Sequence, residues 1–94
     1  MCGIHLVIHS QHTKNDKGTL SRSWSYNDYM KNGFIAGMLR GTDSSGMFQI
    51  NTKGNPFLHK LPLPGFYFTE DAMAQHFLND VDECPINVGH VRAA

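Results

Sequence analysis

A cysteine stands directly behind the initiator methionine, in the opening stretch "MCGI". If Met1 is removed, Cys2 becomes the first residue and carries both a thiol and a free α-amino group. The thiolate is the effective nucleophile of a cysteine, and a free thiol at neutral pH is mostly protonated, so it needs a base. The α-amine of the same residue can take that proton directly or through a water molecule. The alternative is a small buried residue at the start of a strand, and the cysteine taken alone favours this alternative.

A second stretch whose residues could take part in a reaction is "RGTDSSG", residues 40–46. Arg40 is a fixed cation, whereas Asp43 and Ser44 can hydrogen-bond to the local backbone and the flanking glycines allow sharp turns. Such a loop could hold a cation near a nucleophile and stabilise its thiolate. The same residues are also typical of a simple helix stop.

The third stretch is "GHVR", residues 89–92, in an apolar run that reads as a strand. Side chains two apart share a strand face, so His90 and Arg92 should point the same way. The guanidinium of Arg92 offers a planar donor fork that suits a carboxylate. A structural histidine and a surface arginine would leave the same pattern.

Taken together and in this order, "MCGI", "RGTDSSG" and "GHVR" resemble the class II glutamine amidotransferase family. The glutaminase domain of that family belongs to the N-terminal nucleophile hydrolases. The second stretch fits the family pattern Arg-Gly-x-Asp-Ser-x-Gly, and the third fits Gly-His-x-Arg. The resemblance implies a four-layer αββα fold, of which residues 1–94 would be the N-terminal portion of a single glutaminase domain, truncated after the Gly-His-x-Arg strand.

The resemblance also implies a reaction. After removal of Met1, Cys2 would attack the side-chain amide of L-glutamine, and the thioester would yield glutamate. Ammonia would pass to a synthetase domain or chain. Arg92 would bind the α-carboxylate of glutamine. The remaining positions would support the site, with Arg40 near Cys2, Asp43 and Ser44 in the pocket wall, and His90 beside them.

Two groups of the family site lie later in its sequences than the Gly-His-x-Arg strand. One is the Asn-Gly pair that donates hydrogen bonds to the oxyanion, and the other is an Asp that contacts the substrate's amino group. Because the loss of one oxyanion donor costs about 10²–10³ in rate, we expect the 94 residues alone to be nearly or wholly inactive. The alternative function is a non-catalytic, amidotransferase-like module that acts by binding a partner chain.

Composition excludes several other classes. Eight basic and eight acidic residues cancel, and no basic stripe appears, which argues against nucleic-acid binding. No apolar run approaches the roughly 20 residues of a membrane span, and the N-terminus lacks the layout of a signal peptide, so we expect a cytoplasmic protein. His5, His9 and His12 with Cys2 could ligate zinc, but their spacing fits no zinc motif, so we expect no metal and no cofactor.

The elements follow from hydrophobic periodicity. We expect a strand at 2–9, a helix that Ser25 caps and Gly41 stops, a hairpin turning at 53–56, a short helix that Thr69 caps, and a last strand at 86–91. Hairpin-like connections favour an α+β architecture with an antiparallel or mixed sheet and helices packed on it. Nothing follows the last strand, so we expect it to lack a partner and to be exposed.

Overall fold

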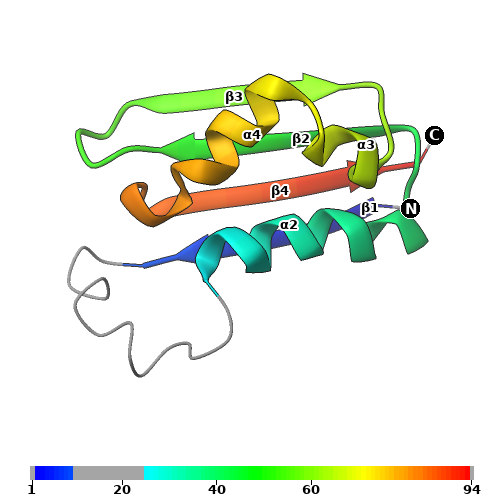
Figure 1. Cartoon of the computed structure of the whole chain (residues 1–94), viewed down its shortest axis with the longest axis horizontal. Coiled ribbons are helices and arrows are strands. Elements are labelled where there is room, and N and C mark those ends of the chain that lie inside the picture. Colours follow the sequence, from blue (N-terminus) through cyan, green and yellow to red (C-terminus); the bar gives the residue numbers. More distant parts are fainter. Residues whose placement is uncertain (1, 10–24, 94) are drawn as a thin grey trace.

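The strands that the structure describes all join one sheet. The computed structural model describes residues 2–9 and 25–93. Its strands are β1 (Cys2–Ile8), β2 (Ser44–Ile50), β3 (Pro56–Leu61) and β4 (Ile86–Arg92). They are ordered β1-β4-β2-β3, and each neighbouring pair is antiparallel. The expected antiparallel or mixed sheet is therefore confirmed in its antiparallel form (Figure 1).

The last strand, β4, lies inside the sheet. It pairs with β1 on one side and with β2 on the other. The prediction that this strand lacks a partner is therefore wrong. Both partners precede β4 in the chain, so the end of the sequence says nothing about the edge of the sheet. Among the described strands, β1 and β3 form the two edges.

The turn between β2 and β3 forms where the sequence predicts it. Asn51 starts this turn, and its side-chain oxygen accepts hydrogen bonds of 2.9 Å from the backbone N–H groups of Lys53 and Asn55. Gly54 has a φ of 84°, which is the left-handed region that glycine adopts without strain. An Asx-type turn and one glycine therefore close the hairpin.

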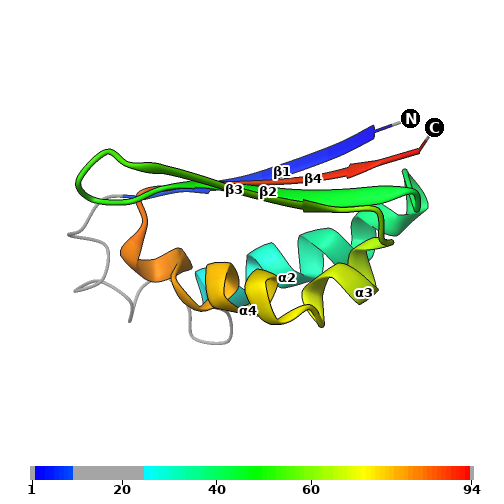
Figure 2. The ribbon, with the colours of Figure 1, turned by 90° about the horizontal axis from the view of Figure 1, so that it is seen from above.

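The helices all cover one face of the sheet, as Figure 2 shows. They are α2 (Tyr26–Ala36), α3 (Gly65–Thr69) and α4 (Ala72–Asn79), with single 3-10 turns η2 (Gly37–Leu39) and η3 (Val81–Glu83). The α+β class is confirmed. None of the helices in the described ranges is long and apolar enough to cross a membrane.

The sequence predicts the N-terminal cap of α2 correctly and that of α4 incorrectly. Ser25 caps α2, and its side-chain oxygen accepts a hydrogen bond of 3.1 Å from the backbone N–H of Asp28. The prediction that Thr69 caps the second helix is wrong, because Thr69 is the last residue of α3. Asp71 caps α4 instead and accepts hydrogen bonds from two backbone N–H groups of its first turn. A carboxylate at this position also faces the positive end of the helix dipole.

Two glycines, one in α2 and one in η2, let the helix lie close to the sheet. A Cβ atom at Gly33 would lie 2.3 Å from Cδ2 of His5 in β1. At Gly37 it would lie 2.7 Å from Cγ2 of Val91 in β4. Both separations are far below the 3.5–4.0 Å of ordinary carbon contacts. The helix therefore rests directly on β1 and β4.

The core lies between the sheet and the helices. Among the apolar residues at helical spacing, Met30, Phe34, Phe77 and Leu78 are buried, whereas Ile35, Leu39 and Met73 are exposed. Leu39 turns outward because α2 ends at Ala36 and continues as a tighter 3-10 turn, which changes the face that each residue presents. The buried hydrophobic cluster consists of Val7, Met30, Phe34, Met47, Phe68, Ala74, Phe77, Leu78, Val81 and Val91.

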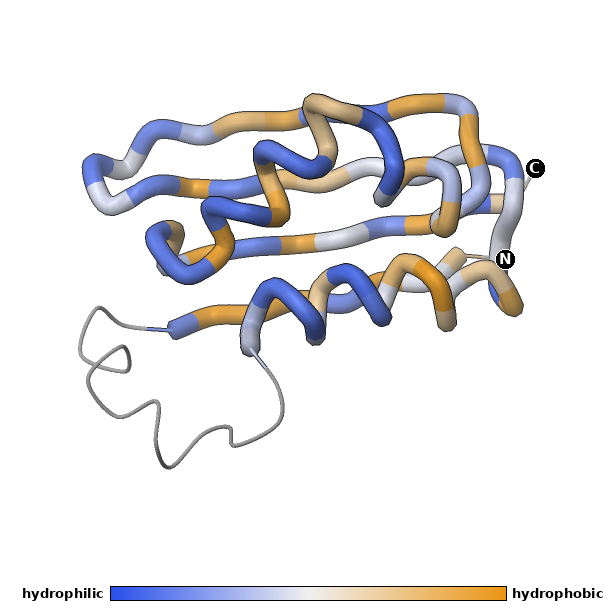
Figure 3. Tube along the Cα trace, in the orientation of Figure 1, coloured by the Kyte–Doolittle hydropathy of each residue, from blue (hydrophilic) through white to orange (hydrophobic). Residues whose placement is uncertain are grey.

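The opposite side of the sheet has no cover among the described residues (Figure 2). We call it the open face, and its apolar residues are Ile4, Leu6, Ile8, Phe48, Ile50, Pro56, Leu58, Ile86 and Val88. Ile4, Ile8 and Leu58 are each about two-thirds exposed. The face of β1 that meets the helices instead carries Gly3, His5 and the smaller Val7. Apolar residues thus line both sides of the sheet, and hydrophobic segments recur along all four strands in Figure 3.

Candidate functional site

The pairing register brings one residue from each of the three sequence motifs into a single row across the sheet. The Cα partner of Cys2 in β1 is Arg92 in β4, and the Cα partner of Arg92 on its other side is Ser44 in β2. Residues opposite one another on neighbouring strands point to the same face, so these three side chains share the open face. The row lies where β1 begins and β4 ends (Figure 1). Both Cys2 and Arg92 are exposed.

The loop before β2 is fastened to the end of β4. The backbone N–H of Asp43 donates a hydrogen bond of 2.9 Å to the carbonyl oxygen of Arg92. A Cβ atom at Gly41 would lie 2.3 Å from the carbonyl carbon of Arg92 and 2.6 Å from the nitrogen of Ala93. Only glycine allows this approach of two backbones. The "RGTD" loop and the "GHVR" strand therefore have a fixed relative position.

Arg40 lies on the other side of β1. Its backbone N–H donates to the carbonyl oxygen of Gly37, which closes the 3-10 turn. A Cβ atom at Gly3 would lie 3.4 Å from Cβ of Arg40, so the arginine stem passes beside the second residue of β1. An open hollow of about 380 Å³ runs along this edge, between β1 and α2. Its lining residues are Cys2, Gly3, Ile4, His5, Gly33, Ala36, Gly37 and Arg40.

The predicted site residues thus lie at one end of the sheet, and His90 lies one row further in than the others. Cys2, Ser44 and Arg92 form the terminal row, and Asp43 and Arg40 flank it. His90 lies in the next row, with Ile4 and Gly46 as its Cα partners, and it is half-buried. The side chain of His90 therefore shares the open face with Arg92 but lies one row further from the strand end.

His5 borders the hollow and was not assigned a packing role by sequence reasoning. Its ring lies over Gly33 and Gly89, where an added Cβ would approach it to 2.3 Å at either glycine. Its Nε2–H donates a hydrogen bond of 3.1 Å to the carbonyl oxygen of Met30, and its ring meets Phe34 edge-on. Burial lowers the pKa of His5, and the hydrogen bond to Met30 partly opposes that shift. The sequence feature that could have indicated this packing role is the presence of Gly33 and Gly89 inside a predicted helix and a predicted strand.

The metal interpretation of the histidines has no support in the described residues. His5 and His9 each direct Nε2 to a backbone carbonyl, at Met30 and Val81 respectively. His12 lies outside the described ranges. Within those ranges, no three histidine, cysteine or carboxylate side chains gather in a way that could hold a metal ion.

The two cysteines differ sharply. Cys84 is buried, and burial together with the nearby carboxylates of Asp80 and Glu83 raises the pKa of its thiol. A raised pKa leaves less thiolate at neutral pH, so Cys84 is a poor nucleophile. Cys2 is exposed. An electrophile in solution therefore meets Cys2 before Cys84.

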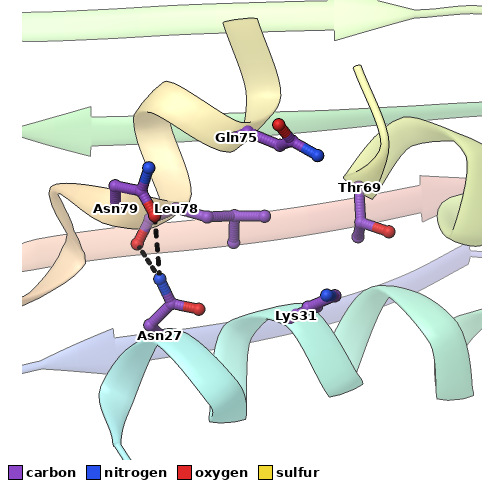
Figure 4. Close-up of a pocket in the computed structure, with 6 residues that line it drawn as sticks. All are labelled: Asn27, Lys31, Thr69, Gln75, Leu78 and Asn79. Carbon is purple, nitrogen blue, oxygen red and sulfur yellow. Dashed lines mark hydrogen bonds between the residues drawn. The ribbon is translucent and has the colours of Figure 1, made fainter. Parts of the chain in front are cut away.

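A second hollow lies between α2 and α4, within the helix layer (Figure 4). Its volume is about 210 Å³, and its lining residues are Asn27, Lys31, Thr69, Gln75, Leu78 and Asn79. The amide of Asn27 donates a hydrogen bond of 2.8 Å to the carbonyl oxygen of Leu78 and thereby joins the two helices. The hydroxyl of Thr69 donates a hydrogen bond to the carbonyl oxygen of Phe66, and none of the lining residues supplies a thiol, an imidazole or a carboxylate that could activate a nucleophile, so we assign no reaction to this hollow.

Comparison of the chain with models of known protein families, with curated proteins and with solved structures found no match. What can be said of its function therefore depends on the geometry of its own residues.

Proposed function

We propose that this chain is the N-terminal part of a class II glutaminase domain, in which Cys2 hydrolyses L-glutamine to glutamate and ammonia. The observation that carries the proposal is the register of β1, β4 and β2, which aligns Cys2, Arg92 and Ser44 in one terminal row. A nucleophile and a carboxylate-binding cation then lie on adjacent strands, about 5 Å apart at their Cα atoms. Glutamine, with an amide at one end and an α-carboxylate at the other, has groups for both.

The chemistry follows from the groups in this row. After Met1 is removed, the α-amine of Cys2 takes the thiol proton, and the thiolate attacks the amide carbon of glutamine. The C–N bond breaks, the amine returns the proton to the leaving nitrogen, and ammonia departs. Water then attacks the thioester, which releases glutamate and restores the thiol. The sum is glutamine and water giving glutamate and ammonia.

Arg92 holds the substrate through its α-carboxylate, for which the guanidinium supplies two parallel N–H donors. Asp43 and Ser44 form the wall of the pocket on the β2 side, and the hydrogen bond from Asp43 to Arg92 keeps that wall in register with the substrate-binding strand. Arg40 supports the start of β1 from the helix side, and His90 supports the row from one position further in.

The reaction also needs donors for the developing oxyanion. The sequence has a single Asn-Gly pair, Asn32–Gly33, and it lies inside α2. Asn32 is bound there, because its side-chain amide donates to the carbonyl oxygen of Asp28 at 2.9 Å. We therefore assign the oxyanion donors to further polypeptide that covers the open face. The four-layer αββα fold and the ammonia-using synthetase belong to this proposal as well.

The test is covalent labelling of the protein purified from its native cells with a diazoketone analogue of glutamine. Mass spectrometry should find Met1 absent and one adduct on Cys2, and an excess of glutamine should prevent its formation. Cys84→Ser is the matched control and should be labelled as the natural chain is, whereas Cys2→Ser should take up no label. Arg92→Gln should slow labelling by the analogue without slowing labelling by iodoacetamide.

Retention of Met1 together with the absence of a Cys2 adduct would rule out the catalytic proposal. The non-catalytic binding module would then be favoured, since an uncovered apolar face with no reactive nucleophile is a binding surface. Labelling of Cys2 that glutamine does not prevent would mean an exposed thiol without a substrate pocket, and it would equally overturn the proposal.

A further inference from the structure

The open face is apolar in continuous rows across all four strands. One row joins Ile8, Ile86, Ile50 and Pro56, and the next joins Leu6, Val88, Phe48 and Leu58. Polar residues begin only in the third row, where His90 and Lys60 lie, and continue in the terminal row with Arg92. About half of the face is therefore hydrophobic without interruption, and the other half mixes apolar and basic groups.

The size of the face decides what can cover it. Three strands of seven residues and one of six, at about 3.3 Å per residue and about 4.8 Å per strand, give a flat area of about 430 Å². Two such faces give about 900 Å² before the relief of the side chains is counted, which places the total close to the roughly 1,000 Å² that a specific interface needs. Exposed contiguous apolar patches on monomers rarely exceed a few hundred Å². The apolar half of the face is thus of a size that free surfaces also show, whereas the whole face is adequate for a modest interface.

The other residues of this sequence cannot supply an apolar cover of that size. Residues 10–24 lie outside the described ranges, and the only large apolar side chains among them are Leu20 and Trp24. The two apolar rows of the face consist of Ile, Leu, Val, Phe and Pro, which the same rows of a second copy would match in chemistry.

We infer that two copies of this chain pair through their open faces and form a helix–sheet–sheet–helix dimer. Sheets that pack face to face lie about 10 Å apart with their strands within about 30° of alignment. Lys60 and Arg92 lie at the same end of the face. A two-fold axis perpendicular to the strands therefore places the basic ends of the two copies at opposite ends of the interface. Leu6, Val88 and Phe48 lie near that axis, and the Cys2 rows remain at the two rims.

This inference does not rest on the glutaminase proposal. Polypeptide that completes a glutaminase domain would occupy the same face, so the dimer is the state in which this chain covers the face by itself. An interface near the lower size limit predicts modest affinity, with dissociation constants on the order of micromolar. The dimer should therefore form at concentrations of tens of micromolar and dissociate on dilution.

The test is sedimentation equilibrium of the 94-residue chain between about 1 and 200 µM. The expected result is a rise from the 10.5 kDa monomer to a mass near twice that value, with no larger species. Leu6→Lys should weaken association by at least tenfold, because it buries a charge at the centre of the interface. Met73→Lys is the matched control, because Met73 is exposed to nearly the same degree (51% against 47%) but lies on the helix layer, and it should leave association unchanged.

Circular dichroism confirms that each variant is folded, and Leu58→Lys replaces Leu6→Lys if the latter unfolds. A monomer throughout the concentration range would overturn the inference. Association that Leu6→Lys and Leu58→Lys leave intact would also overturn it, as would open-ended oligomers that form through the β1 or β3 edge. Labelling of Cys2 by the glutamine analogue reports on the other proposal and does not bear on this one.

Discussion

Gly33 is a helix-interior glycine at which alanine should destabilise the protein. On an isolated helix, glycine to alanine gains about 1 kcal/mol. Here the new Cβ would lie 2.3 Å from Cδ2 and 2.6 Å from Nε2 of His5, so ring and helix must separate by more than 1 Å. Overpacking of this kind typically costs about 1–3 kcal/mol. Because the ring is also held by Met30 and Gly89, it has little room to move, and we place the cost at the upper end.

Gly33→Ala should therefore lower the free energy of unfolding by about 1–2 kcal/mol in urea denaturation. For a domain of this length the melting temperature should fall by about 5–10 °C. Asn32→Ala, one residue away on the exposed side of the same helix, is the control and should change stability by less than about 0.5 kcal/mol.

A double-mutant cycle identifies the cause. His5→Ala removes the ring and is itself destabilising, but in that background Gly33→Ala should gain up to about 1 kcal/mol. The coupling energy between the two sites should thus be about 2–3 kcal/mol. If Gly33→Ala stabilises the natural chain, or if its effect is the same with and without the His5 ring, then the close approach of α2 to β1 is not the reason for this glycine.

Two further predictions concern buried polar groups. Asn87→Leu should lower the free energy of unfolding, measured by urea denaturation, by about 2–4 kcal/mol. The reason is that the fully buried amide of Asn87 donates to the carbonyl oxygen of Cys84 at 2.8 Å and accepts from Gln49 at 3.0 Å. A loss below about 1 kcal/mol would contradict this account. Burial lowers the pKa of His5 below its ordinary value of 6.5, so the unfolded chain binds this proton at a higher pH than the folded chain does. The stability contributed by neutral His5 is therefore complete above pH 6.5 and declines as the pH falls from 6.5 towards the folded pKa. His5→Gln keeps a donor for Met30 and should flatten this part of the stability–pH profile, and an unchanged slope in the variant would show that His5 is not its source.

The local elements were predictable because their signals are local. The turn at Gly54, the cap at Ser25 and the alternation in β1 each depend on residues within a few positions of one another. The position of β4 was not predictable in this way, since its partners are separated from it by most of the chain and no residue of "INVGHV" identifies a central strand. The cap of α4 was missed for another reason. Thr69 and Asp71 are both good caps, and only the packing of α3 decides which of them begins the next helix.

In the candidate site, too, the residues could be predicted from local sequence, but their relative positions could not. Sequence motifs named Cys2, Arg92 and Ser44, but only the register shows that the three lie in one row across adjacent strands. A shift of one residue in either ladder would send one of the side chains to the helix face. What fixes the register is the helix face, where Val91 and Asn87 are fully buried and would become exposed by such a shift.

The composition of β1 carries this argument one step further. A strand that packs only on helices should turn its largest apolar residues towards them, yet Ile4, Leu6 and Ile8 point away. The helices receive His5 and Val7 of the strand, and His9 directly after it. Both histidines are satisfied by backbone carbonyls, so the arrangement is not a register error. The hydrophobic side of β1 is therefore adapted to a contact other than the helix layer. Cys2 lies on that same side, so whatever covers the apolar rows also determines what can reach the thiol.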